Sequence, residues 1–423
     1  MNGYRDTELG RLPDDWDVTQ LSDLVDPART IRYGIVQPGE YDSNGRLLIR
    51  GQDYSKGWVD ADEMFRVSSS VEERYINARV KTGDLIITIV GAGTGHVEEI
   101  PSWLDAANLT QTTARIAVNP KKADSKFLKY MLLSSFGRNQ VSNYLKGAAQ
   151  PGLNCGDVEI FTLPLPVSID EQKAIGASLK SIDDFIASLS QLITKKRDIQ
   201  QATMQQLLTG QRRLPGFSGE WKDGELRDVV KSLEAGVSVN SSDDLPELGL
   251  PCVLKTSALS GGNFFPNEAK TIVAADRRRA CTNPKRNTIL ISRMNTPALV
   301  GEIAYVGKDY DWLFLPDRLW MTRFMSDDCV NARWLAYLLS SRPYRRLLQD
   351  SATGTSGSMK NISKGVLLNL QISYPTIEEQ TAIATILSDM DTELTALEAR
   401  CEKARQLKQG MMQELLTGRI RLV

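Results

Sequence analysis

The ten residues QQLLTGQRRL, from Gln205 to Leu214, occur again almost unchanged as QELLTGRIRL, from Gln413 to Leu422. The two copies are 208 positions apart (413 − 205 = 208). At that constant offset, residues 170–214 match residues 378–422 at 18 of 45 positions without a gap. A period this long is unsuited to a solenoid, so the repeat indicates that a whole module has been duplicated.

Both copies carry helix-start and helix-stop signals. Each begins with a capping box, at residues 168–171 (SIDE) and 376–379 (TIEE), in which a hydroxyl and a carboxylate can satisfy each other's backbone amides. Each ends at a glycine, Gly210 or Gly418, where a left-handed cap is expected. An arginine follows each glycine, near the negative end of the predicted helix dipole: Arg213 and Arg421.

Between these signals an apolar residue recurs at alternating intervals of four and three, which is typical of helices that pack along their length. From residue 171 to residue 209 such a helix would be about 60 Å long, and a helix of that length needs a partner. We predict an antiparallel, coiled-coil-like pair; the alternative is that each helix packs only on its own domain. The predicted packing residues are Ile175, Leu179, Ile182, Ile186, Leu189, Ile193, Ile383, Leu387, Met390, Leu394, Leu397 and Cys401.

The segments that precede the two helices also match each other. Residues 12–25 (LPDDWDVTQLSDLV) resemble residues 214–230 (LPGFSGEWKDGELRDVV), and weaker matches follow in the same order. These pair residues 47–51 with 252–256, 83–91 with 287–295, 127–135 with 334–342, and 147–154 with 354–361. Short apolar runs between Gly, Asn and Asp predict an α+β domain with a twisted sheet in each half, related by an internal pseudo-two-fold repeat.

Composition limits the class of protein. At 423 residues, 41% hydrophobic and 24% charged, the chain is long enough for at least two folded cores. No apolar run approaches the length of a spanning helix, and the first residues lack an export signal, so we expect a cytoplasmic protein without membrane contact. The five cysteines are scattered and never form CxxC, which predicts neither disulfides nor a zinc site.

Catalytic motifs are missing from the sequence. Its single histidine, His96, follows a glycine-rich loop at residues 91–95 that matches neither GxGxxG nor GxxxxGK and is predicted to be a tight turn. There is no NPPY-like or DPPY-like methyltransferase tetrapeptide and no grouping of carboxylates like that of a nuclease. We therefore expect a protein that is not an enzyme, with no metal and no bound cofactor of its own.

Basic and amide side chains are better candidates for function, because Arg and Lys reach phosphates while Arg, Asn and Gln read base edges. Each cluster alone can equally be a solvated surface. The candidates for DNA contact are Arg32, Tyr33, Arg50, Lys56, Lys146, Gln150, Asn154, Lys255, Arg277, Arg278, Arg279, Arg293, Asn295, Lys360 and Asn361.

With its paired LLTGxxR helix ends, EQxAI helix starts and LPxxW domain openings, the chain resembles the specificity subunit of type I restriction–modification systems over its whole length. The resemblance implies a target-recognition domain at 1–168, a central conserved helix at 169–213, a second target-recognition domain at 214–375 and a C-terminal conserved helix at 376–423. It further implies that each domain reads one half of an asymmetric, bipartite site in double-stranded DNA, with the helices setting the spacer.

The implied partners carry the chemistry. Two modification subunits would bind S-adenosylmethionine and methylate adenine, and through them restriction subunits would use ATP and Mg²⁺ to translocate and cleave DNA. A helical scaffold or adaptor that never touches DNA is the alternative, and a stand-alone enzyme is a third hypothesis that the absent motifs disfavour.

Overall fold

A computed structural model describes residues 3–147, 152–242, 249–326, 328–354 and 359–422. The chain forms two compact units, one made of residues 1–191 and 399–423, the other of residues 192–398. The contacts thus divide each long helix near its middle, whereas the sequence suggested whole helices standing between the domains. The exact limits of the recognition domains stay a prediction.

Two long helices are present, as expected from the repeat. Helix α5 spans Ile169–Leu208 and α9 spans Ile377–Leu415. The glycines that follow them, Gly210 and Gly418, have φ of 68° and 70°, the left-handed conformation predicted for the caps.

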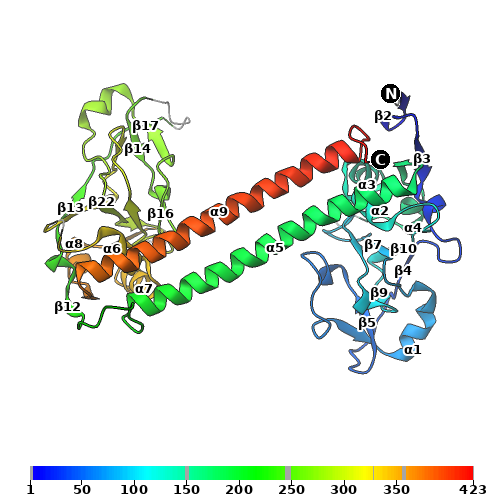
Figure 1. Ribbon diagram of the computed structural model, residues 1–423, viewed down its shortest axis with the longest axis horizontal. Helices are drawn as coiled ribbons and strands as arrows, with labels where there is room; N and C mark the ends of the chain where they lie inside the picture. Colours follow the sequence, from blue (N-terminus) through cyan, green and yellow to red (C-terminus); the bar gives the residue numbers. More distant parts are fainter. Residues whose placement is uncertain (1–2, 148–151, 243–248, 327, 355–358, 423) are drawn as a thin grey trace. The chain divides into compact units, whose positions relative to one another are not determined.

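The first unit contains a mixed set of short elements (Figure 1). In chain order they are β1 Tyr4–Thr7, β2 Gly10–Pro13, β3 Trp16–Gln20, η1 Leu21–Leu24, β4 Arg32–Tyr33, β5 Arg46–Ile49, η2 Gly51–Asp53, β6 Phe65–Val67, α1 Ser69–Glu72, η3 Glu73–Ala78, β7 Leu85–Thr88, β8 Val97–Glu99, η4 Ser102–Leu104, β9 Asn108–Leu109, β10 Thr113–Ile116, α2 Ser125–Leu133, α3 Ser135–Tyr144, α4 Cys155–Glu159 and β11 Thr162–Pro166.

The second unit repeats this series with additions. Its elements are β12 Lys222–Glu225, η5 Leu226–Asp228, β13 Val230–Ala235, β14 Cys252–Leu254, η6 Thr256–Ala258, β15 Leu259–Ser260, β16 Asn263–Phe264, β17 Ala269–Thr271, η7 Ala274–Arg279, β18 Thr288–Ser292, β19 Met294–Asn295, β20 Ile303–Val306, β21 Leu313–Phe314, β22 Leu319–Phe324, α6 Ala332–Ser340, α7 Arg342–Asp350, β23 Lys360–Asn361, α8 Lys364–Leu368 and β24 Gln371–Tyr374.

Sheet topology confirms the predicted duplication. The four-stranded sheets have the orders β4-β10-β7-β8 and β13-β22-β18-β20, and the three-stranded sheets have the orders β6-β5-β9 and β17-β14-β21. In each three-stranded sheet the last-named pair is parallel and the other antiparallel. The matched sequence segments therefore form equivalent strands, and both halves are α+β as predicted.

Each unit has its core on the face of the four-stranded sheet that meets the long helices. In the first unit, sheet residues such as Leu85 and Ile116 pack against Ile175 and Leu179 of α5 and against the end of α9, at Leu415 and Leu416. The second unit repeats this arrangement with the start of α9 and the end of α5, through Ile383, Leu387, Leu207 and Leu208. The opposite sheet face packs on the three-stranded sheet.

The contacts within each unit show that the helix segments run antiparallel. In the first unit Asp183 pairs with Lys408 at 2.6 Å and Ser190 Oγ lies 3.7 Å from Cys401 Sγ. In the second, Lys196 pairs with Glu393 at 2.7 Å and Gln200 Nε2 donates to Asp391 at 2.6 Å. Higher numbers on α5 thus meet lower numbers on α9.

The predicted packing residues divide into two groups. The first turns of each helix pack on their own domain, as the alternative held, and the middle turns face the other helix. Ile175, Leu179, Ile383 and Leu387 are in the domain cores; Leu189, Ile193, Leu394 and Cys401 are buried farther along; Ile182, Ile186, Met390 and Leu397 are half-buried.

Two helical glycines offer a test of this packing. A Cβ on Gly176 of α5 would lie 2.7 Å from the Phe127 amide nitrogen, whereas one on Gly410 of α9 would meet nothing within 4 Å. We expect Gly176→Ala to destabilise the protein by about 1–3 kcal/mol through overpacking. Gly410→Ala should stabilise it by roughly 0.5–1 kcal/mol, because alanine favours the helix. Urea unfolding of both variants measures the difference, and equal effects would contradict the close approach of α5 to α2.

Candidate nucleic-acid interface

A hairpin at residues 353–361 gathers four of the predicted DNA-contact residues in the second unit. Its returning strand β23 pairs antiparallel with β19, with Asn361 opposite Met294 and Lys360 opposite Asn295. The Ile362 amide also donates to the Arg293 carbonyl at 2.8 Å. Arg293 and Asn295 thereby lie beside Lys360 and Asn361, although more than sixty positions separate them in the chain (360 − 295 = 65).

The side chains of this group differ in how far they are engaged. Arg293 lies over the Trp320 ring, 5.7 Å from its centroid, and its Nε is buried without a hydrogen-bond partner, as is Asn361 Oδ1. Asn295 is 7% exposed; its Nδ2 donates to Ser292 Oγ and its Oδ1 accepts from the Thr296 amide. Asn295 therefore shapes the turn, while Arg293 and Asn361 retain unused polar capacity.

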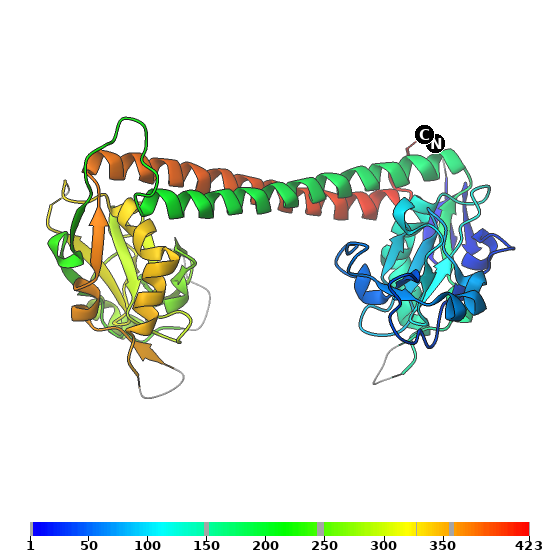
Figure 2. The ribbon, with the colours of Figure 1, turned by 90° about the horizontal axis from the view of Figure 1, so that it is seen from below.

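The first unit has an equivalent hairpin. Lys146 and Gly152 exchange backbone hydrogen bonds, and Gly152 also bridges to Val90, just after β7. Figure 2 shows each four-stranded sheet beside the long helices in its own unit. Of the two hairpins, only the strands at the base belong to the described residues. Gln150 lies outside the described residues. Basic and amide side chains gathered in this way are suited to contacting phosphates and base edges of DNA.

Two candidates on the first hairpin have structural roles. Asn154 caps α4 by accepting from the Asp157 amide at 2.8 Å. Lys146 pairs with Asp157 at 2.7 Å. Burial alone would raise the pKa of Asp157, but the Lys146 ammonium and the Asn154 backbone amide hold that pKa below its usual range. The pair fixes the base of the hairpin.

The remaining candidates are spread over both units. Four of them are held by neighbours: Arg50 by Asp53, Lys255 by Glu268, Arg279 by Asp276, and Arg277 by the Ile272 carbonyl. The exposed ones are Arg32, Tyr33, Lys56 and Arg278. The structure brings together neither group, and contact of any of these residues with DNA stays a prediction.

The repeated arginines play a part that the sequence did not reveal. Arg421 donates from Nε and Nη2 to the two carboxylate oxygens of Glu171 at 2.5 and 2.7 Å, and it also pairs with Asp15 at 2.6 Å. Arg213 makes the same fork with Glu379, at 2.7 and 2.6 Å. Each arginine thus pairs with a carboxylate at the start of the other helix, and its interaction with the dipole of its own helix stays a prediction.

This pairing also changes the predicted capping box. Ser168 Oγ accepts from the Glu171 amide at 3.3 Å, as expected. The Glu171 carboxylate binds Arg421 instead of the Ser168 backbone amide, so the second hydrogen bond of the capping box is not formed. The next residue, Gln172, donates to the Pro166 carbonyl and accepts from the Asp124 amide; Gln380 repeats this with Pro375 and Asn331. The EQ dipeptide thus joins both helices to the domain.

Removing Arg421 tests this joint. Glu171 is 1% exposed and would be left as a buried charge, so Arg421→Gln should lower the free energy of unfolding by about 2–4 kcal/mol. Adding Glu171→Gln to that variant should restore much of the loss, because no buried charge remains. Chemical denaturation of the two variants provides the comparison; an Arg421→Gln variant of unchanged stability would show the fork to be inessential.

A tyrosine on a short helix of each unit, buried in the first unit and half-buried in the second, donates a hydrogen bond to a long helix. Tyr130 of α2 donates to Asp183 of α5 at 2.8 Å, and Tyr337 of α6 donates to Asp391 of α9. Burial, followed by the hydrogen bond to the aspartate, raises the pKa of both phenols, so each stays protonated and donates. The same tyrosine–aspartate hydrogen bond therefore joins a short helix to a long helix in both units.

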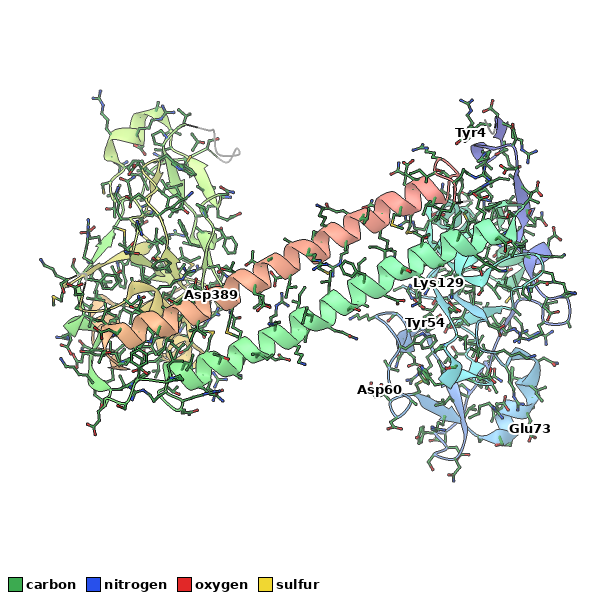
Figure 3. The ribbon with its side chains drawn as sticks, viewed as in Figure 1. Tyr4, Tyr54, Asp60, Glu73, Lys129 and Asp389 are labelled. Carbon is green, nitrogen blue, oxygen red and sulfur yellow. The ribbon has the colours of Figure 1, made fainter. Side chains whose placement is uncertain are left out.

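His96 and the glycine-rich loop give no sign of catalysis. The loop is a turn in which the Thr94 amide donates to the Gly91 carbonyl at 3.1 Å, as predicted. His96 stacks on Tyr54, labelled in the interior of the first unit in Figure 3, with centroids 5.5 Å apart. Within the described ranges, no three His, Cys, Asp or Glu side chains are grouped to hold a metal ion. No helix in those ranges carries an apolar stretch of membrane-spanning length.

Comparison with known families decides the relationship. The model of the type I restriction modification DNA specificity domain matches this chain twice, at residues 13–196 and 218–409. The chain belongs to this specificity-domain family. The two matches fall on the two copies of the repeat.

Relatives of this specificity protein include the putative type I restriction enzyme MjaX specificity subunit of Methanocaldococcus jannaschii, 23% identical over 99% of this chain and 97% of that one. The type I restriction enzyme EcoBI specificity subunit of Escherichia coli is 29% identical over 43% of this chain. That match spans 38% of the EcoBI subunit, and the match to the MjaVIII specificity subunit of M. jannaschii spans 50% of that protein.

Solved structures share the fold of this specificity protein. The type I restriction-modification system S subunit from M. genitalium has a TM-score of 0.62 at 14% identity, covering 95% of this chain and 96% of that one. A chain from a study of complex assembly in the type I R-M system has a TM-score of 0.53 at 18% identity, covering 97% of this chain and 99% of that one. These likenesses support the two-domain α+β architecture.

Proposed function

We propose that this chain is the DNA-recognition subunit of a type I restriction–modification complex and that its two domains read the two halves of an asymmetric, bipartite site. The observation that carries the proposal is the repeat itself. The helix ends and sheet topology are kept in both halves, while the hairpins at residues 146–154 and 353–361 differ in sequence. Helices and sheets that stay the same, together with hairpins that differ, suit the recognition of two different half-sites.

The partners we propose are double-stranded DNA, two modification subunits and, through them, restriction subunits. S-adenosylmethionine, ATP and Mg²⁺ would bind to those partners, and this chain would contribute no catalytic group. We place the complex in the cytoplasm.

Two equivalent grooves support docking of two identical subunits. Each groove lies between the end of a long helix and the junction of two short helices, α6 with α7 or α2 with α3. Their volumes are about 810 and 590 Å³. Five residues of one groove recur in the other at the offset of 208: Gln201, Met204, Gln205, Leu208 and Thr209 correspond to Gln409, Met412, Gln413, Leu416 and Thr417. Grooves that share these residues favour docking of identical partners.

Blocking the grooves one at a time tests this docking. Gln205 and Gln413 are exposed in the two grooves, so Gln205→Arg or Gln413→Arg should each reduce the bound modification subunits from two to one, and the double variant should bind none. The mass of the purified complex gives the count. Leu407→Lys, an exposed change on α9 outside the groove, is the control. Two bound subunits in the double variant would contradict docking at these grooves.

Methylation-sensitive sequencing tests the function as a whole. Expression of this chain with its neighbouring modification subunit in a methylation-free host should yield N6-methyladenine on both strands of a bipartite, asymmetric motif. An unmodified genome, with both proteins folded and associated, would favour the scaffold alternative. Methylation by this chain alone would favour the enzyme. A gel shift of the complex that weakens steeply with salt separates DNA binding from a purely structural role.

A further inference from the structure

Two arginines lie directly opposite each other on neighbouring strands of the first unit. Arg32 of β4 and Arg115 of β10 are Cα partners in an antiparallel pair (Figure 1). Ala114 and Ile116, on either side of Arg115, face the core, so both arginines lie on the other face of the sheet. Like charges in this position repel each other, which favours an anion between them.

An open pocket of about 520 Å³ surrounds this pair, and five of its twelve lining residues are cations. Arg29 and Arg79 line it but already have carboxylate partners, Asp84 and Glu72. Asp105 is the acidic residue in the lining. The described residues place no carboxylate within ion-pair distance of the remaining three cations of the lining, Arg32, Lys81 and Arg115.

Arg115 shows most clearly that this charge lacks a counter-ion. It is 3% exposed, and it donates to the carbonyl oxygens of Asn77 and Arg79 through Nη1 and of Thr30 through Nη2. Its Nε is buried and has no partner. Burial lowers the pKa of this guanidinium and the Arg29 charge adds to that effect, while the Asp84 charge opposes it. Buried cations are usually paired with an anion, as Arg421 is with Glu171.

The second unit supplies an internal comparison. Arg115 lies opposite Ile86 of β7, and the equivalent residue on β22 is the buried Met321, which lies opposite Leu290 of β18. Arg323 lies two positions further along β22. Arg323 pairs with Glu234 of the neighbouring strand β13 at 2.8 Å. The second unit therefore has an apolar residue where the first unit has Arg115, and a carboxylate, Glu234, where the first unit has Arg32.

We propose that the pocket at Arg32, Lys81 and Arg115 binds a phosphate group, which supplies the anion that the first unit lacks. Guanidinium groups bind phosphate oxygens through paired, charge-assisted hydrogen bonds, and the Lys81 ammonium adds a further donor. The phosphate can belong to the DNA backbone or to a free phosphate or nucleotide. The phosphate site does not depend on the proposed DNA function, because it is inferred from cations that have no carboxylate partner.

Thermal unfolding of the full chain in inorganic phosphate, against sodium chloride of equal ionic strength, tests the site. Wild type should show a saturable, phosphate-specific rise in the unfolding midpoint. Arg32→Gln and Lys81→Gln change exposed side chains, and each should weaken the apparent phosphate affinity at least tenfold. Arg323→Gln, which removes an arginine of the second unit that has a carboxylate partner, is the control and should keep the wild-type response. No phosphate-specific rise in wild type, or an equal rise in Arg32→Gln, would overturn the proposal.

Binding of DNA by the assembled complex then identifies the source of the phosphate. If the backbone occupies the pocket, Arg32→Gln should reduce the slope of log affinity against log salt by about one, uniformly across sequences. An unchanged slope, together with lost phosphate binding, assigns the pocket to a free anion. A failure of the methylation experiment would leave the phosphate response intact, so the two proposals fail separately.

Discussion

Replacing residues 1–168 by the corresponding region of another member of the family should change one half of the methylated site completely and leave the other half as it was. The physical reason is that each unit has its own core and its own hairpin, so the side chains that read one half-site do not support the other. Sequencing of the methylated motif measures the result. The reciprocal exchange, of residues 214–375, should change the opposite half.

The exchange has a structural requirement. Asp15 and the Asp124 amide lie within the replaced region and contact Arg421 and Gln172 outside it. A replacement domain with an acidic residue at the position of Asp15 should dock normally, whereas a domain without it should be less stable. A change in both half-sites from a well-folded exchange variant would show that the two domains do not read independently.

Inserting seven residues into both long helices should lengthen the unspecified spacer by about three base pairs. Seven helical residues add roughly 10 Å, and B-DNA rises about 3.4 Å per base pair. Seven residues are chosen because they make one heptad, which is two helical turns. The apolar residues after the insertion therefore stay on the same face of the helix. The insertions belong between Gln191 and Leu192 and between Glu398 and Ala399, where the two units divide each helix.

The controls separate helix length from helix packing. An insertion in α5 alone shifts one helix against the other and should abolish the complex rather than move the spacer. The methylated motif again gives the readout, and both half-sites should keep their bases. A double insertion that methylates the original spacing would mean that the helices do not measure the distance.

The sequence predicted the fold well because the two halves of the chain can be aligned with each other. Matched segments such as 83–91 and 287–295 became equivalent strands, and the glycine caps at Gly210 and Gly418 adopted the expected conformation. The roles of Arg213 and Arg421 escaped prediction because their partners, Glu379 and Glu171, are on the other helix. Local signals such as a helix dipole cannot reveal a contact made across 250 positions.

The candidate DNA-contact residues differ in how well the sequence indicated their roles. Lys360 and Asn361 were predicted because they fall in a matched glycine-rich segment, and their contact with DNA stays a prediction. Arg50 and Arg279 have carboxylates three positions away, Asp53 and Asp276, and this spacing was a signal that they serve local structure. The phosphate pocket was missed except for Arg32, because strand pairing is needed to place its cations together.

The shared core of the first unit has a consequence for synthesis. Ile175 and Leu179 pack with Leu415 and Leu416, which the ribosome adds more than two hundred positions later (415 − 179 = 236). At about 5–20 residues per second, these apolar side chains wait on the order of 10 to 50 s for their partners. The second unit is continuous in sequence and can close first. The nascent first unit therefore exposes part of its core until the last residues of α9 are made.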